Sequence, residues 1–285
     1  MKRKLFMLVV MTLAFSIKAG CQGTGKWFTT KEVAKNVYRI DDHGAVNVYL
    51  VVGRDSALVI DTGMGAADLV SQIKKLTSKP LIVVNTHGHP DHTGANYQFE
   101  KVYIHPADME AAISCSTPES RNAAAQSMLK GEKPQAEETF KGTPENTILI
   151  PVREGYVFNL GKRRIQVIET PGHTPGEICL LDIENKLLFT GDNDNTVVWL
   201  FLPKCRPLHE YLASLEKLRK RMSEFTTLFP GHGVSMPSDF INDQVICVKG
   251  IINATLEARP YQSFAGNAMM STYGRASVAF NPKNL

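Results

Sequence analysis

The sequence predicts a layered α/β fold, in which helices pack against β-sheets. Short apolar segments of strand length alternate with longer segments whose apolar residues recur at helical spacing. The same alternation occurs twice, once in each half of the chain. Alternating strands and helices are typical of sheets covered by helices, so we expect two similar halves that share one fold.

Composition and charge narrow the class of protein. The chain has 285 residues, of which 43% are apolar and 21% charged, as in ordinary globular proteins. Four of its 32 basic residues lie in the first twenty positions, which contain no acid, so the remainder holds 28 basic and 28 acidic residues. A neutral remainder offers no basic surface for nucleic acid, and we expect no nucleic-acid partner. No shift in composition marks a boundary, and we expect a single domain over residues 31–285.

The N-terminus has the pattern of an export signal. Basic residues at 2–4 precede an apolar run over residues 5–17, which is shorter than the roughly 20 residues that a spanning helix needs. We therefore expect a signal peptide over residues 1–20. Ala19-Gly20-Cys21 resembles a bacterial lipoprotein box, in which Cys21 would carry a lipid anchor, although Lys18 departs from that pattern. The expected location is the periplasm or, through the anchor, a bacterial membrane, with residues 21–30 as a polar tether.

The first half is expected to form five strands and two helices. The strands are expected at residues 36–40, 46–52, 57–60, 81–84 and 102–104. The helices are expected at 66–76, where Leu69, Ile73 and Leu76 fall at helical spacing, and at 106–113. Residues 114–146 are polar with weak periodicity. We expect them to form a helical or irregular excursion that either caps a pocket or lies on the surface.

The second half repeats this organisation. Strands are expected at 164–169, 178–182, 186–189, 226–229 and 278–280, and helices at 211–222 and 239–259. The apolar segment 197–202 is expected either to wall a pocket or to join the core or a partner interface. Residues 261–280 are too aromatic for a disordered tail and should pack on the domain. No two cysteines have Cys-x-x-Cys spacing, so we expect no disulfide framework and interpret Cys179 as a core residue.

One loop is unusually rich in metal-ligand side chains. The sequence Thr-His-Gly-His-Pro-Asp-His at residues 86–92 directly follows the strand expected at 81–84. His and Asp are the side chains that zinc takes in reactive sites. On a loop leaving a strand, His87 and His89 can turn towards one ion, and Asp91 and His92 could serve a second.

Three more candidate ligands follow later strands. His173, Asp192 and His232 each lie in a Gly- or Pro-containing loop directly after an apolar segment. Ligand sites in layered α/β sheets gather at strand ends, so all seven side chains have a common place to meet. The sequence therefore predicts a metal-dependent enzyme. By contrast, lone histidines such as His43, His105 and His209 are expected to be structural.

Four motifs together resemble the metallo-β-lactamase superfamily of hydrolases. They are Thr-His-Gly-His-Pro-Asp-His at 86–92, Thr-Pro-Gly-His-Thr at 170–174, Thr-Gly-Asp at 190–192 and Phe-Pro-Gly-His-Gly at 229–233. Ile-Asp-Thr-Gly at 60–63 also fits, and the resemblance covers roughly residues 35 to 255. It implies a four-layer αββα sandwich of two mixed β-sheets flanked by helices.

The resemblance also implies a role for each residue. His87, His89 and His173 would hold one metal ion, Asp91, His92 and His232 a second, and Asp192 would bridge them. Asp61 would orient the ligands through hydrogen bonds. The implied cofactors are two Zn²⁺ ions, with iron or manganese suited to the same side chains. A hydroxide shared by the ions would attack the substrate, and Asp91 would orient it and move the proton.

Asp192 narrows the expected substrate, because most true metallo-β-lactamases have Cys at this ligand. The Asp form resembles glyoxalase II-like thioesterases and lactonases, so we expect hydrolysis of a small-molecule ester, thioester or lactone. The alternatives are a phosphodiesterase or β-lactamase of the same fold, and a mononuclear iron persulfide dioxygenase. The sequence does not specify an oligomeric state.

Overall fold

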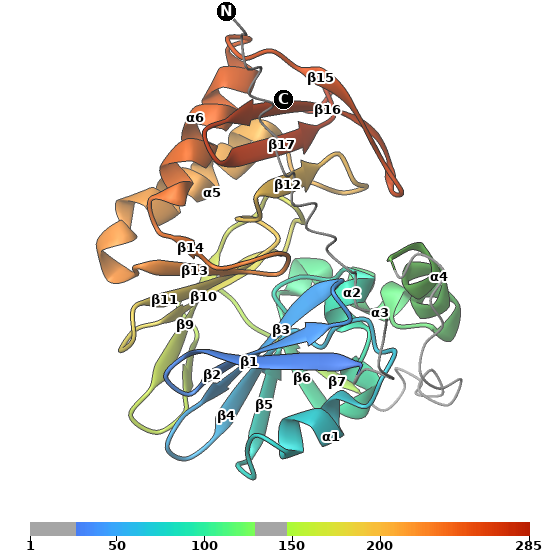
Figure 1. Cartoon of the computed structure of the whole chain (residues 1–285), viewed down its shortest axis with the longest axis vertical. Helices are drawn as coiled ribbons and strands as arrows, with labels where there is room; N and C mark the ends of the chain where they lie inside the picture. Colours follow the sequence, from blue (N-terminus) through green and yellow to red (C-terminus); the bar gives the residue numbers. More distant parts are fainter. Residues whose placement is uncertain (1–26, 129–146) are drawn as a thin grey trace, which may run out of the picture.

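A computed structural model describes residues 27–128 and 147–285 (Figure 1). The signal peptide expected at 1–20, Cys21, and most of the expected tether lie outside these residues. In the two described ranges, no helix combines the length and apolar character needed to cross a bilayer.

The first sheet has seven strands that follow the order of the chain. They are β1 (Phe28–Ala34), β2 (Val37–Asp42), β3 (Val46–Val52), β4 (Ala57–Ile60), β5 (Leu81–Val84), β6 (Lys101–Ile104) and β7 (Ile148–Pro151). Strands β1 to β4 pair antiparallel, whereas β4 to β7 pair parallel. Every residue of β4 is buried, as expected for a central strand covered on both faces.

The second sheet has six strands in the order β14-β13-β11-β10-β9-β8. They are β8 (Val157–Asn159), β9 (Arg164–Glu169), β10 (Ile178–Asp182), β11 (Leu187–Gly191), β13 (Thr227–Pro230) and β14 (Met236–Pro237). Only β11 and β13 pair parallel, so this sheet is also mixed.

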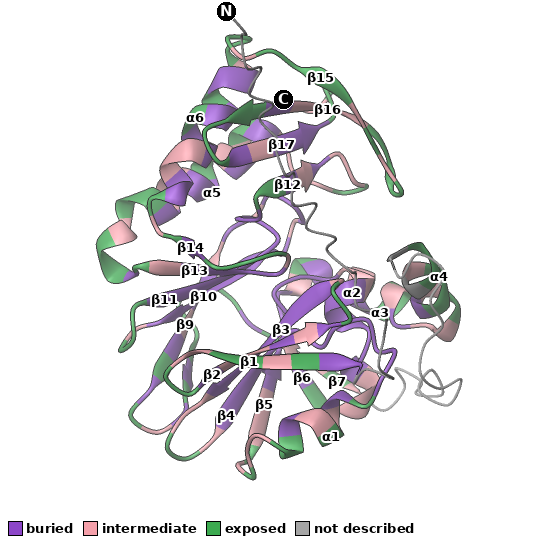
Figure 2. Ribbon diagram, viewed as in Figure 1, coloured by how far each residue is buried: buried purple, intermediate pink, exposed green. Residues whose placement is uncertain are grey.

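The two sheets pack face to face with helices outside. Leu58 of the first sheet and Ile165 and Phe189 of the second belong to one buried cluster between them. On the outer face of the first sheet lies α1 (Leu69–Lys74), which buries Leu69 and Ile73. Helices α5 (Leu208–Lys220) and α6 (Phe240–Ile252) cover the second sheet (Figure 2). The predicted αββα layering is confirmed.

A third sheet was not expected. Its strands are β12 (Val197–Leu200), β15 (Arg259–Ser263), β16 (Gly266–Tyr273) and β17 (Ala276–Phe280), in the order β12-β17-β16-β15. Strand β12 pairs parallel with β17, and Val278 and Phe280 pack in the same buried cluster as the residues of α6. The C-terminal segment therefore packs on the domain, as predicted.

Several element bounds differ from the expected ones. The helix expected at 239–259 ends at Ile252, because Ala254 adopts a left-handed backbone (φ 53°) and Thr255 N–H bonds back to Gly250 O. Residues 28–30, expected in the tether, belong to β1, and Trp27 and Phe28 are buried. The helix expected at 106–113 starts as a 3₁₀ turn (Pro106–Asp108) and continues as α3 (Met109–Cys115). Of the excursion at 114–146, the structure describes α4 (Pro118–Met128) and leaves 129–146 outside.

Candidate metal centre

All seven candidate ligands lie together at the ends of the strands. His87 and His89 lie on the loop after β5, where Pro90 begins the short helix α2 (Pro90–Thr93) that carries Asp91 and His92. The remaining three come from the loops after β9, β11 and β13 and are His173, Asp192 and His232. The other three histidines lie elsewhere: His43 stacks on Trp27, His105 bonds Glu169, and His209 faces the carbonyl oxygen of Leu285.

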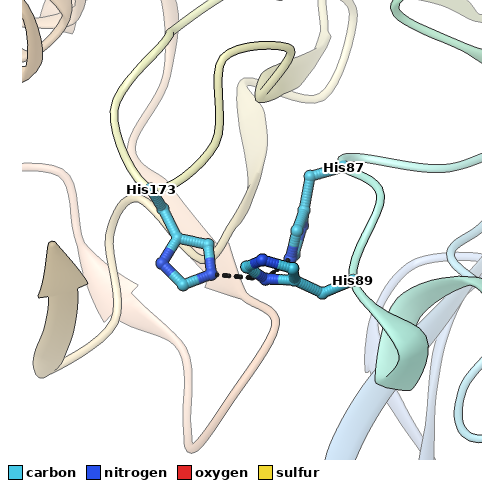
Figure 3. Close-up of side chains that lie close together, drawn as sticks. All are labelled: His87, His89 and His173. Carbon is cyan, nitrogen blue, oxygen red and sulfur yellow. Dashed lines mark hydrogen bonds between the residues drawn. The ribbon is translucent and has the colours of Figure 1, made fainter. Parts of the chain in front are cut away.

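His87, His89 and His173 form a tight group of three nitrogen atoms (Figure 3). His89 Nδ1 lies 3.1 Å from His87 Nε2 and 2.9 Å from His173 Nε2. Three neutral imidazoles whose ring nitrogens converge in this way could hold one divalent cation.

A second group consists of Asp91, His92 and His232. Asp91 Oδ2 lies 3.2 Å from His232 Nε2 and 3.5 Å from His92 Nε2. This group has the donor types that a second divalent cation would accept.

Asp192 lies between the two groups. Its Oδ2 is 3.5 Å from His173 Nε2 and 3.3 Å from His232 Nε2, and its Oδ1 is 3.4 Å from His92 Nε2. One carboxylate therefore contacts histidines of both groups, which is the position that a bridging ligand requires.

The outer nitrogens of three histidines are held by acceptors. His173 Nδ1 donates to the carbonyl oxygen of Trp199 at 2.7 Å, and His232 Nδ1 donates to that of Ala45 at 2.6 Å. His92 Nδ1 donates to Asp61 Oδ2 at 2.9 Å. Because carbonyl and carboxylate oxygens only accept, each of these Nδ1 atoms carries the proton and leaves Nε2 free to bind a cation.

Asp61 also fixes the start of the histidine loop. It accepts hydrogen bonds from the Thr86 backbone N–H (2.7 Å) and from Thr86 Oγ1 (2.8 Å). Its backbone is left-handed (φ 62°), a conformation that Asp and Asn tolerate better than most residues. The position of Asp61 agrees with the orienting role that the resemblance implies.

Two buried carboxylates were missed by the sequence analysis. Glu177 Oε1 accepts the backbone N–H of Asp192 at 2.9 Å. Asp108 accepts from Gly88 N (3.0 Å) and Gly176 N (2.8 Å), so it ties the first histidine loop to the loop of His173. The sequence carries no motif for either residue, because each acts by joining loops that are distant along the chain.

Without a cation, the ligands perturb one another's protonation. Burial, together with the neighbouring His173, lowers the pKa of His89 to about 3. Burial also opposes the charged form of His232, yet Asp192 and Asp91 raise its pKa to about 10. Burial alone would raise the pKa of Asp91, but the neighbouring His92 and His232 hold the pKa of its carboxyl below the ordinary value. The Asp91 carboxyl is therefore ionised, and its negative charge favours a positively charged group in the centre.

Two buried atoms in the centre fit a cation directly. His92 Nε2 and Asp192 Oδ1 make no hydrogen bond within the described part of the chain, although they face each other. Buried polar atoms are normally satisfied, so an acceptor pair of this kind indicates a missing positive partner. The residues present therefore fit a divalent metal.

A cavity of about 770 Å³ opens onto the centre. Five of the candidate ligands line its base: His89, Asp91, His173, Asp192 and His232. Its side walls come from α4, β12 and the loop that joins β15 to β16. This size is typical of small-molecule sites.

Residues 41–232 match the Metallo-beta-lactamase superfamily. Acyl-coenzyme A thioesterase MBLAC2 of Homo sapiens is 28% identical over 232 residues, which cover 73% of this chain and 81% of that relative. Hydroxyacylglutathione hydrolase GloC of Haemophilus influenzae is 30% identical over 141 residues, covering 48% of this chain and 60% of that relative. The solved structure of the inverting sec-alkylsulfatase Pisa1 from Pseudomonas sp. aligns with a TM-score of 0.62 at 19% identity, covering 80% of this chain and 42% of that enzyme. Because the family match spans more than half of the chain, the chain belongs to the metallo-beta-lactamase superfamily of hydrolases.

Proposed function

We propose that this protein is a zinc-dependent thioesterase that holds two metal ions. The proposal of two metal ions rests on the position of Asp192, because its carboxylate contacts histidines of both ligand groups. Relatives named as an acyl-coenzyme A thioesterase and a hydroxyacylglutathione hydrolase support a thioester over the ester or lactone. His87, His89 and His173 would hold one ion, and Asp91, His92 and His232 the other.

The chemistry divides between the ions and the chain. Bound ions would polarise the thioester carbonyl and lower the pKa of the attacking water. Asp91 lines the cavity, where its carboxylate can accept a proton from that water and pass it to the leaving sulfur. Asp61, Trp199 and Ala45 keep three imidazoles in the tautomer that leaves Nε2 free.

A substrate screen on zinc-loaded protein tests the proposal. Release of free thiol from an acyl thioester should be abolished by chelator and restored by zinc. His209→Asn is a matched control, because His209 is exposed and outside the site, whereas His173→Asn should lose activity. Rapid turnover of a phosphodiester or of nitrocefin, without thioester cleavage, would replace this function with the corresponding alternative.

The metal itself needs a separate measurement. His and carboxylate ligands suit iron and manganese as well as zinc. Metal content per chain, measured on protein purified without added metal, is expected to show two zinc ions. One iron per chain with oxygen uptake on a persulfide would indicate a dioxygenase instead.

We further propose that the protein is exported and anchored through Cys21. The support is the basic and apolar pattern of residues 1–20 and the Ala-Gly-Cys sequence that follows. Mass spectrometry of the native protein should find a mature N-terminus at a lipidated Cys21. A chain that retains Met1 in the cytoplasm would reject both export and the anchor.

A further inference from the structure

The cavity beside the metal centre has two unlike walls. Helix α4 presents Ser120, Ala123, Ala124 and Ser127 to it, four small residues whose spacing places them on one helix face. The other wall contains the large side chains of Trp199, Tyr261 and Phe264. In Figure 1 the hairpin of β15 and β16 extends towards the side where α4 lies.

The aromatic wall is a packed cluster rather than three separate side chains. The ring centroid of Trp199 lies 5.4 Å from that of Phe264 and 5.3 Å from that of Phe201. Trp199 Nε1 donates to Tyr261 Oη at 3.2 Å, which satisfies the indole N–H and leaves apolar ring surface facing the cavity. Phe264 is nonetheless 63% exposed.

Charge in the cavity is confined to its metal end. Among the described residues that line it, none is Lys or Arg, and the carboxylates are Asp91 and Asp192 at the base. The described walls therefore offer apolar contact, and none of their residues is a basic side chain that would pair with a phosphate or carboxylate group.

We propose that this cavity binds an aliphatic acyl chain, which lies between the small-residue face of α4 and the rings of Trp199 and Phe264. The inference rests on the proposed thioesterase function and specifies its substrate as a thioester of a long apolar acid. The thioester carbon then lies at the metal end, and the alkyl tail extends towards the tip of the hairpin.

Trp199 connects the two ends of the cavity. Its side chain belongs to the aromatic wall, while its carbonyl oxygen accepts the hydrogen bond from His173 Nδ1 at 2.7 Å. The wall is therefore fixed relative to a candidate metal ligand. A bound alkyl chain would be held in one register with respect to the scissile bond.

A chain-length series measures this preference. Zinc-loaded full-length protein should cleave decanoyl-N-acetylcysteamine with kcat/KM at least about 10-fold above that of the acetyl thioester. Ala124→Phe, which fills the cavity from α4, should remove that preference by lowering kcat/KM for the decanoyl thioester. Tyr273→Ala is the matched control, because Tyr273 is an exposed aromatic residue of β16 outside the cavity.

Binding without hydrolysis provides a second measurement. The chain has two tryptophans, so the Trp27→Phe variant reports on Trp199 alone. The uncharged thioether S-decyl-N-acetylcysteamine should change its fluorescence, whereas the S-methyl compound should not. If Trp27→Phe fails to fold, the response of the wild type and its loss in Trp199→Phe give the same information.

The outcomes separate the two proposals. Thioester cleavage with no chain-length preference and no fluorescence response would overturn the acyl-chain site and leave the thioesterase intact. A fluorescence response to the decyl compound without cleavage of any thioester would overturn the thioesterase and support the apolar site.

Discussion

At the residue scale, Asp91 is the candidate ligand to which we assign the proton transfer, and it lies where the metal centre meets the cavity. Its Oδ2 lies 3.2 Å from His232 Nε2, and the residue also lines the base of the cavity. Asn in its place would keep an oxygen for the metal but would not accept a proton. We expect Asp91→Asn to lower kcat/KM by about 10²–10⁴-fold. Metal content should be measured on the same sample, and unchanged activity with full metal content would reject the proposed proton transfer.

Asp61 offers a test of ligand orientation that leaves the backbone unchanged. Asn tolerates the left-handed conformation of residue 61 as Asp does, so Asp61→Asn alters the hydrogen bonds alone. All three partners of the Asp61 carboxylate are donors, namely Thr86 N, Thr86 Oγ1 and His92 Nδ1. The NH₂ group of the asparagine side chain would therefore face one of these three donors, and that hydrogen bond would be lost.

We therefore expect Asp61→Asn to weaken zinc affinity by about 10–100-fold. Competition with a chromophoric chelator measures the affinity directly. Wild-type affinity in a correctly folded variant would show that Asp61 does not orient His92.

At the element scale, the site depends on close backbone contact between the loop after β4 and helix α2. Gly94 N donates to Gly63 O at 2.8 Å, and Thr62 N donates to His92 O at 2.8 Å. A Cβ at residue 94 would lie 2.3 Å from the carbonyl carbon of Met64. The two segments can pack this closely only while residue 94 has no side chain.

Gly94→Ala should therefore separate these segments. Overpacking of this kind typically destabilises by about 1–3 kcal/mol. Urea unfolding in chelator measures the loss of stability, and zinc affinity should fall with it because His92 moves with α2. A variant as stable as the wild type would show that the loop after β4 can move to accommodate a side chain at residue 94.

The sequence predicted the family and the layering correctly, and its seven candidate ligands lie together in the structure. The prediction failed where structure depends on contacts between distant residues. The ligands at residues 87–92 are close together in the sequence, so the motif alone predicts that they share one loop. Glu177 and Asp108 are ordinary acids until folding brings the loops that they join together. Strands β15 and β16 are partly exposed and lack a regular apolar pattern, and β16 pairs with β17 to build the third sheet. Local pattern could not predict that pairing.

At the scale of the whole molecule, the ligand cluster should couple metal binding to stability. It contains buried histidines and carboxylates, and His92 Nε2 and Asp192 Oδ1 have no hydrogen-bond partner among the residues that the structure describes. Metal that binds only the folded state adds about 2.7 kcal/mol at a concentration 100 times Kd. Chelator should lower Tm, and added zinc should restore it. A Tm indifferent to both would argue against a bound metal.

The stability of the fold should also depend on Asp42, a buried carboxylate that is not a candidate ligand. Asp42 Oδ1 accepts from Trp27 Nε1 (2.5 Å) and Oδ2 from Met64 N (2.8 Å). Burial raises the pKa of Asp42 from 3.8 to about 6, although both hydrogen bonds lower it. The folded state therefore binds this proton more tightly than the unfolded state. The resulting stability is fully present below pH 3.8 and is lost as the pH rises through 6.

Metal-free protein in chelator allows this contribution to be measured. The free energy of unfolding of the wild type, relative to Asp42→Ala, should fall by roughly 3 kcal/mol between low pH and about pH 7. Comparing the two proteins cancels the titration of other groups. A difference that does not vary with pH would mean that Asp42 ionises normally.

The parallel pairing of β12 with β17 links the metal centre to the C-terminal segment of the chain. Trp199 lies opposite Ala279 in this pair, and its carbonyl oxygen is the acceptor for His173. Until β17 pairs with β12, the acceptor of His173 lacks the neighbouring strand that holds it in the folded protein. We therefore expect the orientation of His173, and with it the capture of the proposed ions, to be completed late in folding.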